Sequence, residues 1–144
     1  MTTVSKIALP AILENLYALI ASVRDAANSL TMRPRSVLDI ELALEEALVN
    51  IINHAYKGQT PGQIEVICII DGKESLTIEI IDSGMPFNVL SAPQPDLTLD
   101  VSEREPGGLG VHLMKQLVDN VTYRREGDRN IVQFQVHLDR EQVL

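Results

Sequence analysis

Residues 45–56 read EEALVNIINHAY, and they belong to a helix that we expect from about 34 to 56 of this 144-residue chain. Glu46, Asn50 and Asn53 are spaced so that they line one narrow polar stripe of that helix. Around the stripe the helix carries mostly apolar residues: Leu38, Leu42, Leu44, Leu48, Val49, Ile51 and Ile52. We therefore expect a mostly buried helix, in which a polar stripe costs stability unless its groups are paired. The stripe is a candidate site.

The polar stripe offers two kinds of chemistry. The side-chain oxygen of Asn50 is a neutral ligand of the kind that Mg²⁺ takes alongside waters and substrate phosphates. Glu46, one turn earlier, is placed to accept a proton from an attacking hydroxyl, whereas Glu45 points about 100° away from the stripe. The plainer alternative is that these groups line the rim of a groove open to water. His54 is a ligand, a switch or a structural residue near the helix end.

Residues 82–87, DSGMPF, follow an apolar strand. A carboxylate at a strand end, as at Asp82, can accept a hydrogen bond from a ligand amine such as the exocyclic amine of adenine. Gly84 has no side chain and lets a ring approach, Pro86 stiffens the exit, and Phe87 can pack beneath. The plainer alternative is an Asx-type turn between strand and loop.

Residues 107–110, GGLG, precede an amphipathic helix that we expect to end near residue 119, with Leu109, Leu113 and Leu117 on one face. Free N–H groups at the first turn of such a helix can face an anion. No Lys–Ser/Thr pair follows the glycines, so the segment is no P-loop, and a simple helix-entry turn explains it equally well. Arg104, just before the glycines, is either a solvated side chain or a group that stabilises a transferring phosphate.

The rest of the chain predicts helices and strands in the order β-α-α-β-β-loop-α-β-β. The predicted elements besides those above are an edge strand at 3–9, a helix at about 12–29, a hairpin of 64–70 and 76–82 turning at Asp71 and Gly72, and a hairpin of 121–138 turning at about 127–130. Such an order favours an α+β fold with a sheet covered on one face by helices. Residues 88–106 form a proline-rich connection that is long for a compact domain, and we therefore predict that they form a lid.

Composition limits the class of partner. The length suits one domain, the net charge is −8, and 3% of residues are aromatic with no Trp. A phosphate backbone would be repelled, which argues against a nucleic-acid partner. Cys68 is the only cysteine, and no run approaches the length of a membrane span or a leader peptide. We therefore expect a reduced, cytoplasmic location without a membrane.

The three segments together resemble the GHKL ATPase superfamily (gyrase, Hsp90, histidine kinase and MutL type). EEALVNIINHAY corresponds to its N box, DSGMPF to its G1 box and GGLG to its G2 box. Within it, the chain is most similar to the anti-sigma factor serine/threonine kinases of the RsbW and SpoIIAB kind. The matching positions are Glu46, Asn50, His54 and Tyr56, then Asp82, Gly84, Pro86 and Phe87, then Gly108, Gly110 and Met114.

The resemblance implies a two-layer α/β sandwich of the Bergerat type, with a mixed, mostly antiparallel sheet covered on one face by about three helices. It implies one ATP-binding kinase domain over residues 1–144, with the lid at about 88–106. The implied activity is transfer of phosphate from ATP to a protein serine, with Mg²⁺ as cofactor and ADP as product. The implied partners are a STAS-domain anti-anti-sigma protein as substrate, an alternative sigma factor, and a second copy in a homodimer.

The resemblance also implies roles for single residues. Glu46 would be the general base, Asn50 the Mg²⁺ ligand, Asp82 the adenine anchor, and Arg104 a group near the γ-phosphate. The other implied nucleotide-binding positions are Asn53, His54, Gly84, Pro86, Phe87, Gly107, Gly108, Leu109, Gly110 and Val111. One departure stands in the last hairpin, where many relatives carry a Gly-Thr pair whose Thr supports the adenine-binding Asp. This chain has GDRN at 127–130, so we expect that support to come from another residue.

A second function, from a different class, fits the same three segments. A nucleotide-sensing binding module in a partner-switching pathway would use the adenine and phosphate contacts without phosphorylating anything. Glu46 distinguishes the two hypotheses, since a module that only binds nucleotide needs no base there.

Overall fold

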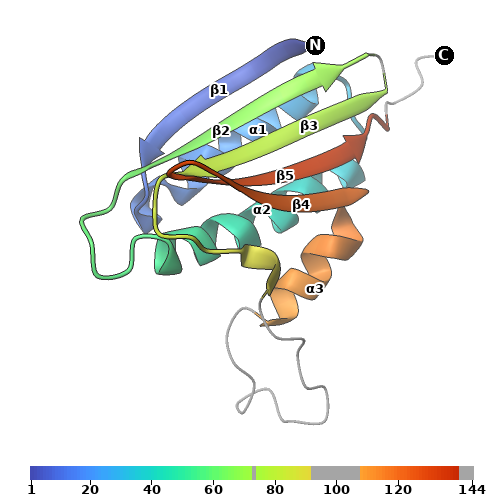
Figure 1. The fold of residues 1–144 in the computed structure, drawn as a ribbon. Helices are drawn as coiled ribbons and strands as arrows, with labels where there is room; N and C mark the ends of the chain where they lie inside the picture. Colours follow the sequence, from blue (N-terminus) through green and yellow to red (C-terminus); the bar gives the residue numbers. More distant parts are fainter. Residues whose placement is uncertain (73, 92–107, 140–144) are drawn as a thin grey trace, which may run out of the picture.

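The computed structural model describes residues 1–72, 74–91 and 108–139, and Figure 1 shows their arrangement. The elements along the chain are β1 Thr2–Pro10, η1 Leu13–Asn15, α1 Leu16–Ser29, α2 Pro34–His54, β2 Gln63–Asp71, β3 Ser75–Asp82, η2 Val89–Ser91, α3 Gly108–Leu117, β4 Asn120–Glu126 and β5 Arg129–His137. The predicted order of helices and strands is confirmed. The predicted lid lies, from residue 92 to 106, outside the described residues, and so do Arg104 and Gly107.

The strands form one sheet in the order β1-β2-β3-β5-β4, with each described pair antiparallel. Both predicted hairpin turns are confirmed by glycines with positive φ, at +71° for Gly72 and +58° for Gly127, a conformation that side chains disfavour. The pairing of β3 with β5 brings together segments that are far apart in the sequence. It sets Asp82, the last residue of β3, directly opposite Asn130.

The helices cover one face of this sheet, which confirms the predicted α+β fold (Figure 1). Alternate residues of β2 and β3 point into the layer between sheet and helices, where Phe134 of β5 is fully buried. Helix α2 lies between α1 and α3 and buries its face formed by Leu44, Leu48 and Ile51. Apolar burial of this kind is the main term that stabilises the fold.

Two of the apolar residues assigned to the buried part of α2 lie at the surface instead. Leu38 and Leu42 keep 48% and 43% of their surface exposed. They stand one turn apart near the start of the helix, on the side that no described element covers. The buried part of α2 is therefore one face that runs along the helix from Val37 to Ile51.

The leucine face predicted for α3 is not the most deeply buried side of the helix. Leu113 is 43% exposed, whereas Val111 and Met114 are buried, followed by Val118 just past the helix end. Leu117 is partly buried against the core. Apolar residues surround this short helix, so spacing alone selects no face, and packing against α2 decides which one turns inward.

No helix within the described ranges is long and apolar enough to cross a membrane.

Candidate nucleotide site

The C-terminal end of α2 is attached to the segment DSGMPF by hydrogen bonds. The N–H of Met85 donates to the carbonyl oxygen of Ala55 at 2.9 Å. The hydroxyl of Tyr56 accepts the N–H of Ser83 at 2.8 Å and donates to the carbonyl of Gln63 at 2.8 Å. Tyr56 is buried, so these bonds are protected from water. The end of α2 thus fixes the path of the chain as it leaves β3.

The close packing at position 84 leaves no room for a side chain, so a glycine is required there. A Cβ at this position would overlap the backbone carbonyl of Ala55, which cannot move without disturbing the end of α2. The φ angle of Gly84 is not positive, so the requirement comes from close approach and not from backbone conformation. The sequence predicted that Gly84 admits a ligand ring; in the structure, the space that a Cβ would need is taken by Ala55 at the end of α2, so the glycine lets the turn lie directly on that helix.

Gly84→Ala is expected to lower the free energy of unfolding by about 1–3 kcal/mol, because the added methyl group overpacks a rigid contact. Urea unfolding followed by circular dichroism measures this change. Ser83→Ala is the matched control, since Ser83 is the exposed neighbour in the same turn and its N–H, not its side chain, bonds Tyr56. An equal, small change for both variants would show that the turn does not depend on its contact with Ala55.

Asp82 ends β3 as a buried carboxylate, 2% exposed. Its Oδ1 accepts the N–H of Gly84 at 2.9 Å and the side-chain amide of Asn130 at 2.9 Å. The first bond is the Asx-type turn that was the plainer alternative, but it uses one oxygen only. Burial raises the pKa of Asp82, while the bonds from Asn130 and Gly84 and the charge of Arg125 oppose that rise.

His54 and Phe87 stack on each other at the same end of the site. Their ring centroids are 5.3 Å apart and the planes are tilted by 38°. Phe87 packs against the core, whereas His54 and Pro86 are exposed. The contact is a second link between the end of α2 and the DSGMPF segment.

Glu46 lies at the other end of the site, against the first turn of α3. A Cβ on Gly110 would overlap the Glu46 carboxylate, so the glycine allows α3 to begin directly beside this side chain. Glu46 is half-buried, and burial together with the negative charge of Glu45 raises its pKa. A carboxylate with a raised pKa is a better proton acceptor near neutral pH.

The residues present fit a magnesium ion held mainly by a nucleotide. Asn50 is half-buried one turn beyond Glu46, while Asn53 is exposed. Within the described ranges no group of three or more His, Cys, Asp and Glu side chains forms a metal cage. Mg²⁺ commonly keeps several waters and takes few protein ligands beside substrate phosphates, so a single amide oxygen suits it.

The three predicted segments therefore converge on α2. Residues 54–56 contact DSGMPF, and Glu46 contacts Gly110 at the start of α3. From Glu46 to His54 the helix rises about 12 Å, a span suited to a nucleotide that extends from base to terminal phosphate. Val111 is buried. Gly108 stands at the start of α3, where free N–H groups favour an anion.

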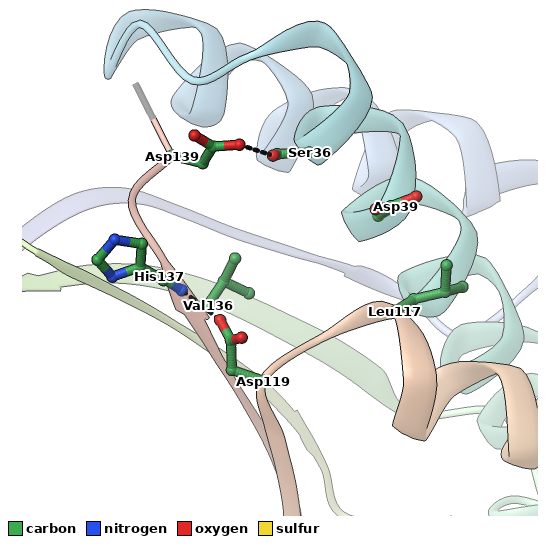
Figure 2. A pocket seen from close by; sticks show the side chains of 7 residues that line it. All are labelled: Ser36, Asp39, Leu117, Asp119, Val136, His137 and Asp139. Carbon is green, nitrogen blue, oxygen red and sulfur yellow. Dashed lines mark hydrogen bonds between the residues drawn. The ribbon is translucent and has the colours of Figure 1, made fainter. Parts of the chain in front are cut away.

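A separate hollow of about 280 Å³ lies at the opposite end of β5 (Figure 2). It is lined by Ser36, Asp39, Leu117, Asp119, Val136, His137 and Asp139. Its carboxylates are already engaged: Asp139 accepts from the Ser36 hydroxyl at 3.0 Å, and Asp119 from the His137 N–H at 2.6 Å. None of the predicted site residues lines it.

Three residues of β4 and β5 lie beside the predicted site residues Asp82 and Gly84, although no sequence motif pointed to them. They are Tyr123, Arg125 and Asn130, and Asn130 contacts the other two as well as Asp82. The only signal in the sequence was the missing Gly-Thr pair, which led us to expect another supporting residue. Asn130 is the residue of that hairpin that contacts Asp82 directly.

The chain resembles known proteins over most of its length. Residues 9–136 match the family described as the histidine kinase-like ATPase domain. The serine-protein kinase RsbW of Listeria monocytogenes is 33% identical over 97 residues, which cover 64% of this chain and 61% of that protein. The anti-sigma F factor of Clostridium acetobutylicum is 27% identical over 105 residues, covering 73% of this chain and 72% of that one. The match thus spans less than two thirds of the Listeria relative.

A solved structure shares the fold. The crystal structure of the RsbU and RsbW domains of a Mycobacterium tuberculosis protein superposes with a TM-score of 0.67 at 16% identity, covering 95% of this chain and 33% of that one. The antiparallel sheet, the helices on one face and the matched residues agree with the superfamily expected from the three segments. The chain belongs to the histidine kinase-like ATPase domain family.

Proposed function

We propose that this chain is an ATP-dependent protein-serine kinase that acts as an anti-sigma factor. The relatives named as serine-protein kinase and anti-sigma factor motivate the activity. The observation that carries the proposal is the position of Glu46, a half-buried carboxylate with a raised pKa beside the start of α3. A module that only bound nucleotide would gain nothing from a proton acceptor at the phosphate end.

Each segment has a proposed task. Asp82 anchors adenine, with Gly84, Pro86, Phe87, His54 and Asn53 around the base and ribose. The N–H groups at the start of α3 face the phosphates, with Arg104 near the terminal one. Residues 1–144 are proposed to form one kinase domain with a lid at about 88–106. Most of the catalytic effect would come from positioning and charge stabilisation.

The proposed reaction transfers the γ-phosphoryl group to a serine. The Glu46 carboxylate takes the proton from the serine hydroxyl as its oxygen attacks the γ-phosphorus, and the bond to the β–γ bridging oxygen breaks to release ADP. Asn50 would hold Mg²⁺, which when bound neutralises charge on the phosphate oxygens. The raised pKa of Glu46 predicts that transfer declines on acidification at a higher pH than an ordinary Glu would allow.

The proposed partners follow from the same relatives. The serine acceptor would belong to a STAS-domain anti-anti-sigma protein, and the unphosphorylated partner would compete with an alternative sigma factor for this chain. A homodimer acting in the cytoplasm is part of the proposal. The net charge of −8 does not favour direct contact with nucleic acid.

Transfer of labelled phosphate tests the kinase proposal. The chain is incubated with γ-³²P-labelled ATP, Mg²⁺ and each STAS-domain protein of the same genome, and the labelled residue is located by mass spectrometry. We expect label on one serine of one such protein, and none when that serine is replaced by Ala. Clean ATP binding without transfer to any of these proteins would overturn the kinase proposal and favour the nucleotide-sensing module.

A further inference from the structure

Asn130 is a buried amide in the middle of the site's adenine end. It is 1% exposed, stands near the start of β5, and pairs in register with Asp82 at the end of β3. A buried amide without partners is costly, so a side chain of this kind persists only where its hydrogen bonds are made.

The hydrogen-bonding capacity of Asn130 is fully used. Its Nδ2 donates to Oδ1 of Asp82 at 2.9 Å and to the carbonyl of Met85 at 2.8 Å. Its Oδ1 accepts the Tyr123 hydroxyl at 2.6 Å, the Phe87 N–H at 3.2 Å and a guanidinium N–H of Arg125 at 3.2 Å. The reverse amide orientation would turn an NH₂ group toward three donors, so the partners dictate this orientation.

The two oxygens of Asp82 differ in their hydrogen bonds. Oδ1 receives two donors, from Asn130 and Gly84. Among the described residues no hydrogen bond uses Oδ2. An ionised Oδ2 only accepts, so it matches the 6-amino group of adenine and repels the 6-oxo group of guanine.

We propose that Asn130 is the positioning residue that holds Asp82 with Oδ2 toward the nucleobase, and that it thereby sets the preference for a 6-aminopurine over a 6-oxopurine. The inference rests on the proposed nucleotide site and deepens it. Asn130 contacts Asp82 and the Met85 carbonyl at once, so it ties the anchor to the loop that carries the base-facing residues. A Ser or Thr at this position has a single O–H group, so it could donate only one of these two hydrogen bonds.

Arg125 reinforces the same geometry from β4. One guanidinium nitrogen donates to the carbonyl of Gly84 at 2.8 Å and to Oδ1 of Asn130. Arg125 and Tyr56 are the ionisable groups of the described residues that face Asp82, from β4 and from the end of α2. The bond from Asn130 is the largest of the effects that lower the pKa of Asp82, against the effect of burial. Its loss would let Asp82 become protonated at higher pH, and a protonated Asp82 accepts poorly.

Asn130→Thr and Asn130→Val form a matched pair that tests this role. The two side chains have similar size and strand preference, but only Thr can donate a hydrogen bond to Asp82. ATP and GTP binding are measured by calorimetry between pH 5 and 8, with Gln133→Val as a control on the other face of β5. In the Val variant, we expect the ratio of ATP affinity to GTP affinity to fall roughly tenfold. On acidification, this variant should lose ATP binding at a higher pH than the wild type does. The Thr variant should retain most of both properties.

The outcomes separate this inference from the proposed function. Wild-type chain that binds neither nucleotide would overturn the proposed function itself. If the wild type prefers ATP and a folded Val variant shows the same preference and the same pH profile, only the role of Asn130 is overturned. If the Val variant does not fold, Asn130→Ala decides, because it removes the donor to Asp82 without placing a second carboxylate beside it. Unchanged selectivity and pH profile in that variant would contradict the inference.

Discussion

Glu46→Gln is expected to lower the rate of phosphoryl transfer roughly 10²- to 10⁴-fold while leaving ATP affinity nearly unchanged. Glutamine keeps the size of the side chain and its place beside Gly110, but it cannot take a proton from the attacking serine. Single-turnover transfer to the proposed STAS-domain substrate measures the rate, and calorimetry measures ATP affinity. The wild-type rate should also fall with acidification as Glu46 becomes protonated, and this fall should be absent from the residual rate of the variant.

Glu45→Gln is the control for that experiment. Glu45 is the adjacent residue on α2, points away from the polar stripe and contributes to the raised pKa of Glu46. Its replacement should leave transfer near the wild-type rate and move the acid limb of the pH profile to lower pH. Equal losses in both variants would mean that the negative charge of the helix, and not a specific base, supports transfer.

Asp82→Asn is expected to weaken ATP binding roughly 10- to 100-fold, the cost of one hydrogen bond to a charged acceptor in a buried site. Asparagine has no satisfactory orientation at this position. With its oxygen toward Gly84 and Asn130, its NH₂ group faces the adenine amine, and with the opposite orientation it faces two donors of the protein.

The matched control is Asp25→Asn, which removes an exposed carboxylate from α1 at the same change in net charge. Its ATP affinity should equal that of the wild type. GTP binding gives a second readout, because loss of the Asp82 charge removes the repulsion of the 6-oxo group and should bring the two affinities closer. Unchanged ATP affinity in Asp82→Asn would remove Asp82 from the role of adenine anchor.

Local patterns predicted most of this fold because the signals were strong and close together in sequence. The hairpin at Gly72 needs a positive φ, and an Asp-Gly pair supplies it. Pro34 suits the first position of α2, and the sequence placed the start of that helix correctly. The proposed roles of Glu46 and Asn50 stay predictions, and they rest on the same kind of local pattern, because a polar stripe on an apolar helix is visible within a few turns.

The parts that were missed depend on packing between distant segments. Asp82 and Asn130 become neighbours only through the register of β3 with β5, which no local pattern encodes. The burial of Met114 and the exposure of Leu113 depend on how closely α3 approaches α2, and that approach depends on Gly110 beside Glu46. A short helix with apolar residues on several sides does not reveal such a choice.

A crystal structure of the chain with Mg²⁺ and a non-hydrolysable ATP analogue tests the central claim most directly. The account predicts the adenine amine about 3 Å from Oδ2 of Asp82, Asn50 on the metal, and the terminal phosphate beside Glu46 at the start of α3. A nucleotide found elsewhere, such as in the hollow between Ser36 and His137 (Figure 2), or an adenine amine that bonds a residue other than Asp82, would contradict it.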